Sequence, residues 1–136
     1  MSDLLKSLDI SASGMKSQGT RLRVISENVA NAGSTALTPE GEPYRRKLVT
    51  FGSTLNRELG VELVDVQRIS RDNSDFARRY EPHHPAADAT GYVTMSNVNS
   101  VIEMADMREA QRSYQANLKV LQASRRMLQQ TIELLR

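Results

Sequence analysis

Two apolar ladders with a seven-residue step lie at opposite ends of the chain. A seven-residue step keeps side chains on one stripe of an α-helix, so each ladder predicts a helix that packs along another helix. The first ladder is Leu8, Met15, Leu22 and Val29, and the second is Met107, Tyr114, Leu121, Leu128 and Leu135. We therefore expect a mainly α fold in which long N- and C-terminal helices pair as a coiled coil.

Local signals place the ends of these helices. A glycine directly after residues 2–32 is a natural stop for the first helix. Ser100 and Glu103 have the spacing of a capping box at the start of the second helix, although Asn97 or Asn99 could cap an earlier start. The second helix then continues to about residue 135 without a glycine or proline.

The segment between the helices predicts a small, irregular, β-rich region. Residues 44–51 and 60–69 have β-like composition, and residues 91–95 form a short extended piece. Gly, Ser, Thr and Pro dominate the stretch before the first of these strands, which is typical of a loop. The expected division is an axial core domain of paired helices, residues 1–32 and 97–136, and a loop and short-strand region, residues 33–96.

The ladders and the apolar residues beside them are the candidate helix seam and assembly surface. The second helix is longer than the first, so part of its stripe is expected to remain for another subunit. Polar residues beside such a seam fix register at a cost in stability, and Asn28, Asn31 and Asn117 are the candidates for this role. The predicted seam residues are Leu8, Met15, Leu22, Ile25, Val29, Met104, Met107, Tyr114, Leu118, Leu121, Leu128, Ile132 and Leu135.

Composition and charge narrow the class of protein. Apolar residues make up 39% of the chain and aromatic residues 4%, which favours a thin helix-pair seam over a thick globular core. The net charge of +2, from 18 basic and 16 acidic residues, is too balanced to indicate nucleic-acid binding. A solvated strand, or a salt-bridged contact with a neighbouring subunit, therefore explains the basic run from Arg45 to Lys47 better.

Several kinds of chemistry have no sequence support. The absence of cysteine excludes disulfides, thiolate metal sites and cysteine nucleophiles. There is no apolar run of membrane-spanning length, and no Sec-type signal is visible, so we expect any export to use another route.

The best candidate metal cluster is His83 and His84 with Glu81 and Asp88. Adjacent histidines on an extended chain point to opposite sides, so a polar turn between prolines is the better interpretation. There is no G-x-S-x-G, Walker or G-x-G-x-x-G motif. We expect no catalytic residue, no cofactor and no metal, and therefore no enzyme.

Particular strings resemble the flagellar rod, hook and hook-associated axial proteins. Residues 10–32 resemble the N-terminal signature of that family, a Ser/Ala-rich helix that ends in E-N-x-A-N. Three later strings extend the resemblance over nearly the whole chain, and the first two are typical of one basal-body rod protein. They are H-P-x-A-D-x-x-G-Y-V from His84 to Val93, N-V-N-x-x-x-E-M-x-D-M from Asn97 to Met107, and R-x-Y-x-A-N from Arg112 to Asn117.

The resemblance implies a structural subunit of the proximal rod of the bacterial flagellar basal body, located where the rod spans the periplasm. Such subunits assemble into a tubular drive shaft that transmits torque and encloses the export channel. The implied partners are copies of the chain, other proximal rod proteins, a FliE-type collar protein and the adjoining MS ring. Export by the flagellar type III apparatus, without a cleaved signal peptide, is also implied. Neither nucleic-acid binding nor membrane insertion is expected.

A second class of function also fits the two ladders. A soluble coiled-coil adaptor would use the same helix pair to form a discrete oligomer. That adaptor predicts a defined oligomer in light scattering, whereas a rod subunit predicts a monomer or open-ended association.

Overall fold

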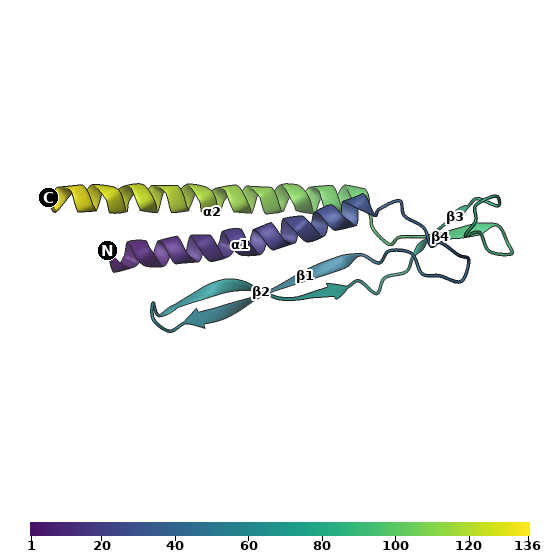
Figure 1. Ribbon diagram of the computed structural model, residues 1–136, viewed down its shortest axis with the longest axis horizontal. Helices are drawn as coiled ribbons and strands as arrows, with labels where there is room; N and C mark the ends of the chain where they lie inside the picture. The colour runs from purple at the N-terminus through teal and green to yellow at the C-terminus, as the bar shows by residue number, and fades with distance from the viewer. The chain divides into compact units, whose positions relative to one another are not determined.

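The computed structural model describes all residues from Met1 to Arg136. In chain order its elements are α1 (Ser2–Ala30), β1 (Lys47–Asn56), β2 (Val61–Arg71), β3 (Ala77–Tyr80), β4 (Tyr92–Met95) and α2 (Ser100–Leu134), as labelled in Figure 1. The predicted fold class is confirmed, because two long terminal helices contact each other and a small β region lies between them in sequence. Neither helix contains a stretch that is both long and apolar enough to cross a membrane.

The chain divides into two compact units, which are described separately. The first unit contains residues 1–22, 49–68 and 108–136. It therefore holds most of α1, most of α2 and the greater part of the β1–β2 hairpin. The second unit contains residues 23–48 and 69–107, with the end of α1, the β3–β4 hairpin and the start of α2.

In the first unit, a two-stranded hairpin accompanies the helix pair. The turn after β1 closes with a 2.8 Å hydrogen bond from the N–H of Gly60 to the carbonyl of Asn56. Gly60 has a φ of +65°, a conformation that glycine adopts without steric cost. The Ser17 hydroxyl donates to the Val64 carbonyl at 3.3 Å, which ties α1 directly to β2.

In the second unit, β3 and β4 pair antiparallel, from Ala77 opposite Met95 to Tyr80 opposite Tyr92. Val93 is fully buried and supplies the small core of this hairpin. Gly91 has a φ of +87°, and a Cβ there would lie 2.7 Å from the Tyr80 ring. Glycine is therefore required at this turn on two separate grounds.

Three local predictions were inaccurate. The first strand runs over Lys47–Asn56 rather than residues 44–51, since the residues just before Lys47 turn into a polar cluster described below. The strand β3 was not predicted, because its four residues are all exposed and show no alternation. The predicted capping box does not form. Asn99 caps α2 by accepting from the N–H of Val101 at 3.1 Å, and the side chain of Glu103 is used elsewhere.

Candidate assembly surface

Three contacts between α1 and α2 define how the helices pair in the first unit. The hydroxyls of Ser7 and Ser124 are 3.0 Å apart, and Arg21 lies 3.6 Å from Glu109. Gly14 lies against Asn117 between these two contacts along the helices. The residue numbers of each pair add up to 130 or 131, so the helices are antiparallel with one constant register.

Gly14 of α1 packs directly against the side chain of Asn117 of α2. A Cβ added there would lie 2.7 Å from Nδ2 of Asn117 and 2.9 Å from its Cγ. The Asn117 amide itself donates to the Ser113 carbonyl at 3.0 Å, which holds it in this position. Glycine at position 14 therefore lets an asparagine side chain fit between the helices.

Small and polar residues, rather than the leucine ladders, line the most buried part of this interface. Ser11 and Ser124 are almost completely buried, and Ala110 is fully buried. Small side chains allow the two backbones to come close together, and larger ones are then displaced to either side. This is a feature of the seam that the seven-residue pattern alone did not predict.

The predicted seam residues fall into three classes of exposure. Ile25 is buried, whereas Met104, Ile132 and Leu135 are exposed. The remaining residues are half-buried: Leu8, Met15, Leu22, Val29, Met107, Tyr114, Leu118, Leu121 and Leu128. Their role in assembly stays a prediction, and half-burial leaves apolar surface that a neighbour could cover.

A row of apolar side chains on α2 faces solvent in the first unit. Val120, Met127 and Leu134 follow one another at steps of seven residues and are 48%, 49% and 87% exposed. Ala123 lies between Val120 and Met127, Ala116 precedes Val120 by four residues on the same side of the helix, and both alanines are also exposed. We call these five residues the outer stripe. Single exposed apolar residues are ordinary, but a continuous row along a helix is typical of an interaction surface.

The three predicted register asparagines have different surroundings. Asn28 is buried, and its Oδ1 accepts from the N–H of Lys47 at 3.0 Å and from the hydroxyl of Tyr44 at 2.7 Å. Its Nδ2 donates to the Lys47 carbonyl at 2.9 Å and to Glu103 at 3.2 Å. The side chains of Asn31 and Asn117 bond within their own helices. A role in register stays a prediction for all three.

An ion cluster in the second unit centres on Arg46. Its Nε donates to the carboxylate of Glu103, which is 1% exposed, in a very short contact. Its other nitrogens lie 3.3 Å from Asp72 and 3.5 Å from Asp106. The backbone N–H of Arg46 donates to Oδ1 of Asn97 at 2.7 Å. This cluster joins the start of β1 to the first turn of α2.

The cluster shifts the pKa values of its members in directions that favour the observed contacts. Partial burial alone would lower the pKa of Arg46, but hydrogen bonds and charges from Glu103 and Asp72 outweigh it and raise that pKa. Hydrogen bonds from the N–H and hydroxyl of Ser74 lower the pKa of Asp72. Burial, helped by nearby carboxylates, raises the pKa of Tyr44, so its hydroxyl remains a donor to Asn28.

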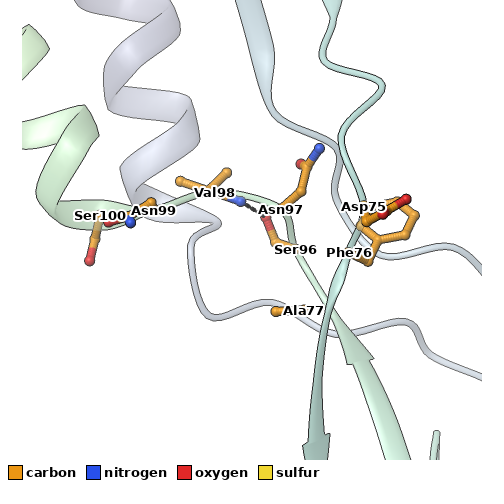
Figure 2. Close-up of a pocket in the computed structure, with 8 residues that line it drawn as sticks. All are labelled: Asp75, Phe76, Ala77, Ser96, Asn97, Val98, Asn99 and Ser100. Carbon is orange, nitrogen blue, oxygen red and sulfur yellow. Dashed lines mark hydrogen bonds between the residues drawn. The ribbon is translucent and has the colours of Figure 1, made fainter.

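A pocket lies beside the ion cluster, and Figure 2 shows Asp75 and Phe76 on one side of it and the segment from Ser96 to Ser100 on the other. The Val98 N–H donates to the Ser96 hydroxyl at 3.2 Å and fixes this segment. The guanidinium of Arg45 covers the ring of Phe76 at 4.2 Å.

The basic run from Arg45 to Lys47 is used within the chain. Arg45 stacks on Phe76, Arg46 binds Glu103, and Lys47 pairs with Glu27 at 2.9 Å. The expectation of a solvated strand was therefore wrong for this run, and a contact with a neighbouring subunit stays a prediction. The partners of Arg46 belong to the N-V-N-x-x-x-E-M-x-D-M string, because Arg46 bonds to its Asn97, Glu103 and Asp106. That string was the available sequence signal for the intrachain contact.

The histidine pair lies in a turn. Nδ1 of His84 accepts from the N–H of Ala86 at 3.0 Å, and its Nε2 is 3.4 Å from the Thr35 hydroxyl. His83 is exposed. Asp88 accepts from Thr90 and Tyr92, which lowers its pKa to about 2. Its ion pair with Arg78 spans 2.5 Å and fixes the same turn.

Comparisons with known proteins identify the family to which this chain belongs. The family model "Flagellar basal body rod FlgEFG protein C-terminal" matches residues 89–134. The flagellar basal-body rod protein FlgC of Agrobacterium fabrum is 53% identical over 136 residues, which cover 100% of this chain and 98% of that protein. FlgC of Salmonella typhimurium is 40% identical over 131 residues, covering 96% and 97%, and FlgC of Bacillus subtilis is 38% identical over 143 residues, covering 94% and 95%. The chain belongs to the FlgC family of flagellar basal-body rod proteins.

Proposed function

We propose that this rod protein forms part of a tubular wall through the outward faces of its terminal helices. The observation that carries the proposal is the outer stripe of α2, an exposed apolar row that does not include Ser124, the residue through which α2 contacts Ser7 of α1. Burying one fully exposed Val, Leu or Met side chain contributes about 1.5–3 kcal/mol. Several such residues on each subunit supply a substantial driving force for association.

Membership of the family sets the class of function. The chain is a structural protein of the proximal rod, it is not an enzyme, and it assembles with other flagellar rod proteins. The ion cluster and the buried contacts of α1 with α2 supply the stiffness that a load-bearing subunit requires. Torque transmission and enclosure of the export channel are the parts of this function that we infer.

The contacts between subunits are inferred to be heterologous. The outer stripe of α2 and the α1 side of the helix pair differ in sequence, so one copy presents different surfaces to its two neighbours. Heterologous contacts build rings or open helical tubes rather than closed dimers. Further proposed partners, supported by the family resemblance, are copies of the chain, a FliE-type collar protein, the MS ring and the flagellar type III export apparatus.

Charged substitutions in the outer stripe test the proposal. We expect Ala116→Lys combined with Met127→Lys to abolish rod assembly and swimming in cells that carry no other copy of the gene. Gln122→Lys is the matched control, since Gln122 is exposed on the opposite side of α2. Circular dichroism of the purified variants would show that the helices remain folded.

Normal swimming of the Ala116→Lys, Met127→Lys variant would contradict the proposal. A stable closed dimer of the native chain in light scattering would also contradict it, and would favour the discrete adaptor instead.

A further inference from the structure

One face of α1 near the N-terminus borders a groove in the first unit. Asp3, Lys6, Ser7 and Ile10 have the spacing i, i+3, i+4 and i+7, so they share one side of the helix. The other walls of the groove come from β2 and α2, through Val61, Asn117 and Val120. Ile10 and Val120 are both about half exposed, which makes the floor partly apolar.

The C-terminal end of α2 carries a second face with the same spacing. Gln129, Ile132 and Glu133 follow i, i+3 and i+4, and Arg136, just past the end of α2, lines the same depression. In the register of the helix pair, the first residue of α1 lies opposite residue 129, so α2 continues past it. Leu134 and Leu135 in this extension are strongly exposed.

The two faces match when they are aligned antiparallel. Asp3 then meets Arg136, Lys6 meets Glu133, Ser7 meets Ile132, and Ile10 meets Gln129, and the residue numbers of every pair add up to 139. Both charged pairs are attractive, and Ile132 comes to lie next to Ile10. We infer that the C-terminal end of α2 from a second copy of this chain docks along this α1 groove. The inference rests on the proposed function and names one contact within it.

The charged residues of both faces are available to pair with a second copy. Asp3, Lys6, Glu133 and Arg136 form no ion pair within the chain. Their unpaired state contrasts with the basic run around Arg46, in which each cation has an intrachain partner.

The same pairing cannot form inside one chain. In the intrachain register Asp3 lies opposite residue 128. The end of α2 at Leu134 is a further six residues along, about 9 Å at the rise of an α-helix, and Arg136 lies beyond it. A contact between Asp3 and Arg136 therefore has to come from two different copies. Because the docked helix end and the groove are different surfaces, each copy can bind one neighbour through its groove and another through its C-terminal end.

Disulfide trapping tests the contact directly, since the native chain contains no cysteine. We would produce Asp3→Cys and Arg136→Cys as separate chains in the same cells and oxidise the assembled rods. Formation of a disulfide requires Cα atoms within about 7 Å of each other. We expect a covalent dimer of two copies, each of 15.2 kDa, with residues 3 and 136 joined in the mass spectrum. Asp9→Cys, which places the thiol on another side of α1, is the matched control and should not give this dimer.

A charge exchange provides a second measurement if the cysteine chains assemble poorly. Asp3→Arg alone and Arg136→Asp alone should each reduce swimming, and the double exchange should restore it. Asp9→Arg combined with Arg136→Asp should not restore it. Recovery by the double exchange cannot come from helix stability, because an arginine in the first turn of α1 is unfavourable in both variants that carry it.

Two results would overturn the inference. One is assembled, rotating rods without a 3–136 disulfide, or with residue 136 joined only to a different rod protein. The other is a double exchange as impaired as the worse single variant. Neither result contradicts the proposed rod function. That proposal is contradicted only if the outer-stripe variant swims normally or the native chain forms a closed dimer.

Discussion

Removing Arg46 should be among the most destabilising single changes in the second unit. The variant Arg46→Leu leaves Glu103, which is 1% exposed, with only the Nδ2 of Asn28 as a partner. An uncompensated buried charge of this kind typically costs about 3–5 kcal/mol of the free energy of unfolding. We expect a loss of that size for Arg46→Leu.

The reverse substitution should cost less, because the two residues differ in exposure. In Glu103→Leu the guanidinium of Arg46 keeps Asp72 and Asp106, and its side chain is 20% exposed. We expect a loss of about 1–3 kcal/mol, the cost of an incompletely satisfied buried donor. The double variant carries no unpaired buried charge and should lose no more than Glu103→Leu alone. The coupling energy in this cycle is then at least as large as the loss in Arg46→Leu, about 3 kcal/mol.

Urea unfolding followed by far-ultraviolet circular dichroism measures all three variants. Arg78→Leu is the matched control, since Arg78 also binds a carboxylate, Asp88, but the two side chains are 56% and 35% exposed. That control should lose less than about 1 kcal/mol. Additive losses in the double variant, or a loss in Arg46→Leu no larger than in the control, would refute the assignment of Glu103 as a buried charge held by Arg46.

Two further predictions concern α1 and the β3–β4 turn. Gly19→Ala should stabilise α1 by about 0.5–1 kcal/mol, because nothing lies within 4 Å of the added carbon. Gly14→Ala should instead lower the free energy of unfolding by about 1–3 kcal/mol, because the added carbon meets Asn117. Thermal unfolding compares the two variants, and equal melting temperatures would contradict the contact of Gly14 with Asn117. The pKa of Asp88 is lowered to about 2, so its contribution to stability is complete above the ordinary value of 3.8 and is lost as the pH falls towards 2. An NMR titration of the native chain should show the Asp88 carboxylate titrating near this lowered pKa. Asp88→Asn should remove the pH dependence of the turn between those two values.

The helices and their pairing could be predicted from the sequence, and the inner contacts could not. Apolar residues at seven-residue steps predict a helix that packs along another, and α1 and α2 end within a few residues of the expected positions. The same pattern says nothing of which side chains come closest. Gly14 and Ser11 are small residues with no hydrophobic signal and Ala110 is only weakly apolar, so their contacts are decided when the two helices are placed together.

The ion cluster illustrates a second limit. Arg46 and Glu103 are 57 residues apart in sequence, and each looks like an ordinary surface residue by itself. A capping box was the local interpretation of Glu103, and tertiary pairing with Arg46 replaced it. The strand β3 was missed for a related reason, because its residues are exposed and it is held by pairing with β4 rather than by its own composition.

The small inner seam also explains how one helix pair can serve both the monomer and the rod. If leucines filled the line of closest approach, they would be buried within the chain and unavailable to neighbours. Here Ser124, Ala110 and Gly14 take those positions, and Leu121 and Leu128 remain half-buried beside them. Each half-exposed leucine keeps roughly half of the ~1.5–3 kcal/mol that complete burial contributes. The ladder that predicted an intrachain helix pair therefore still has free energy to gain when a second copy packs against it.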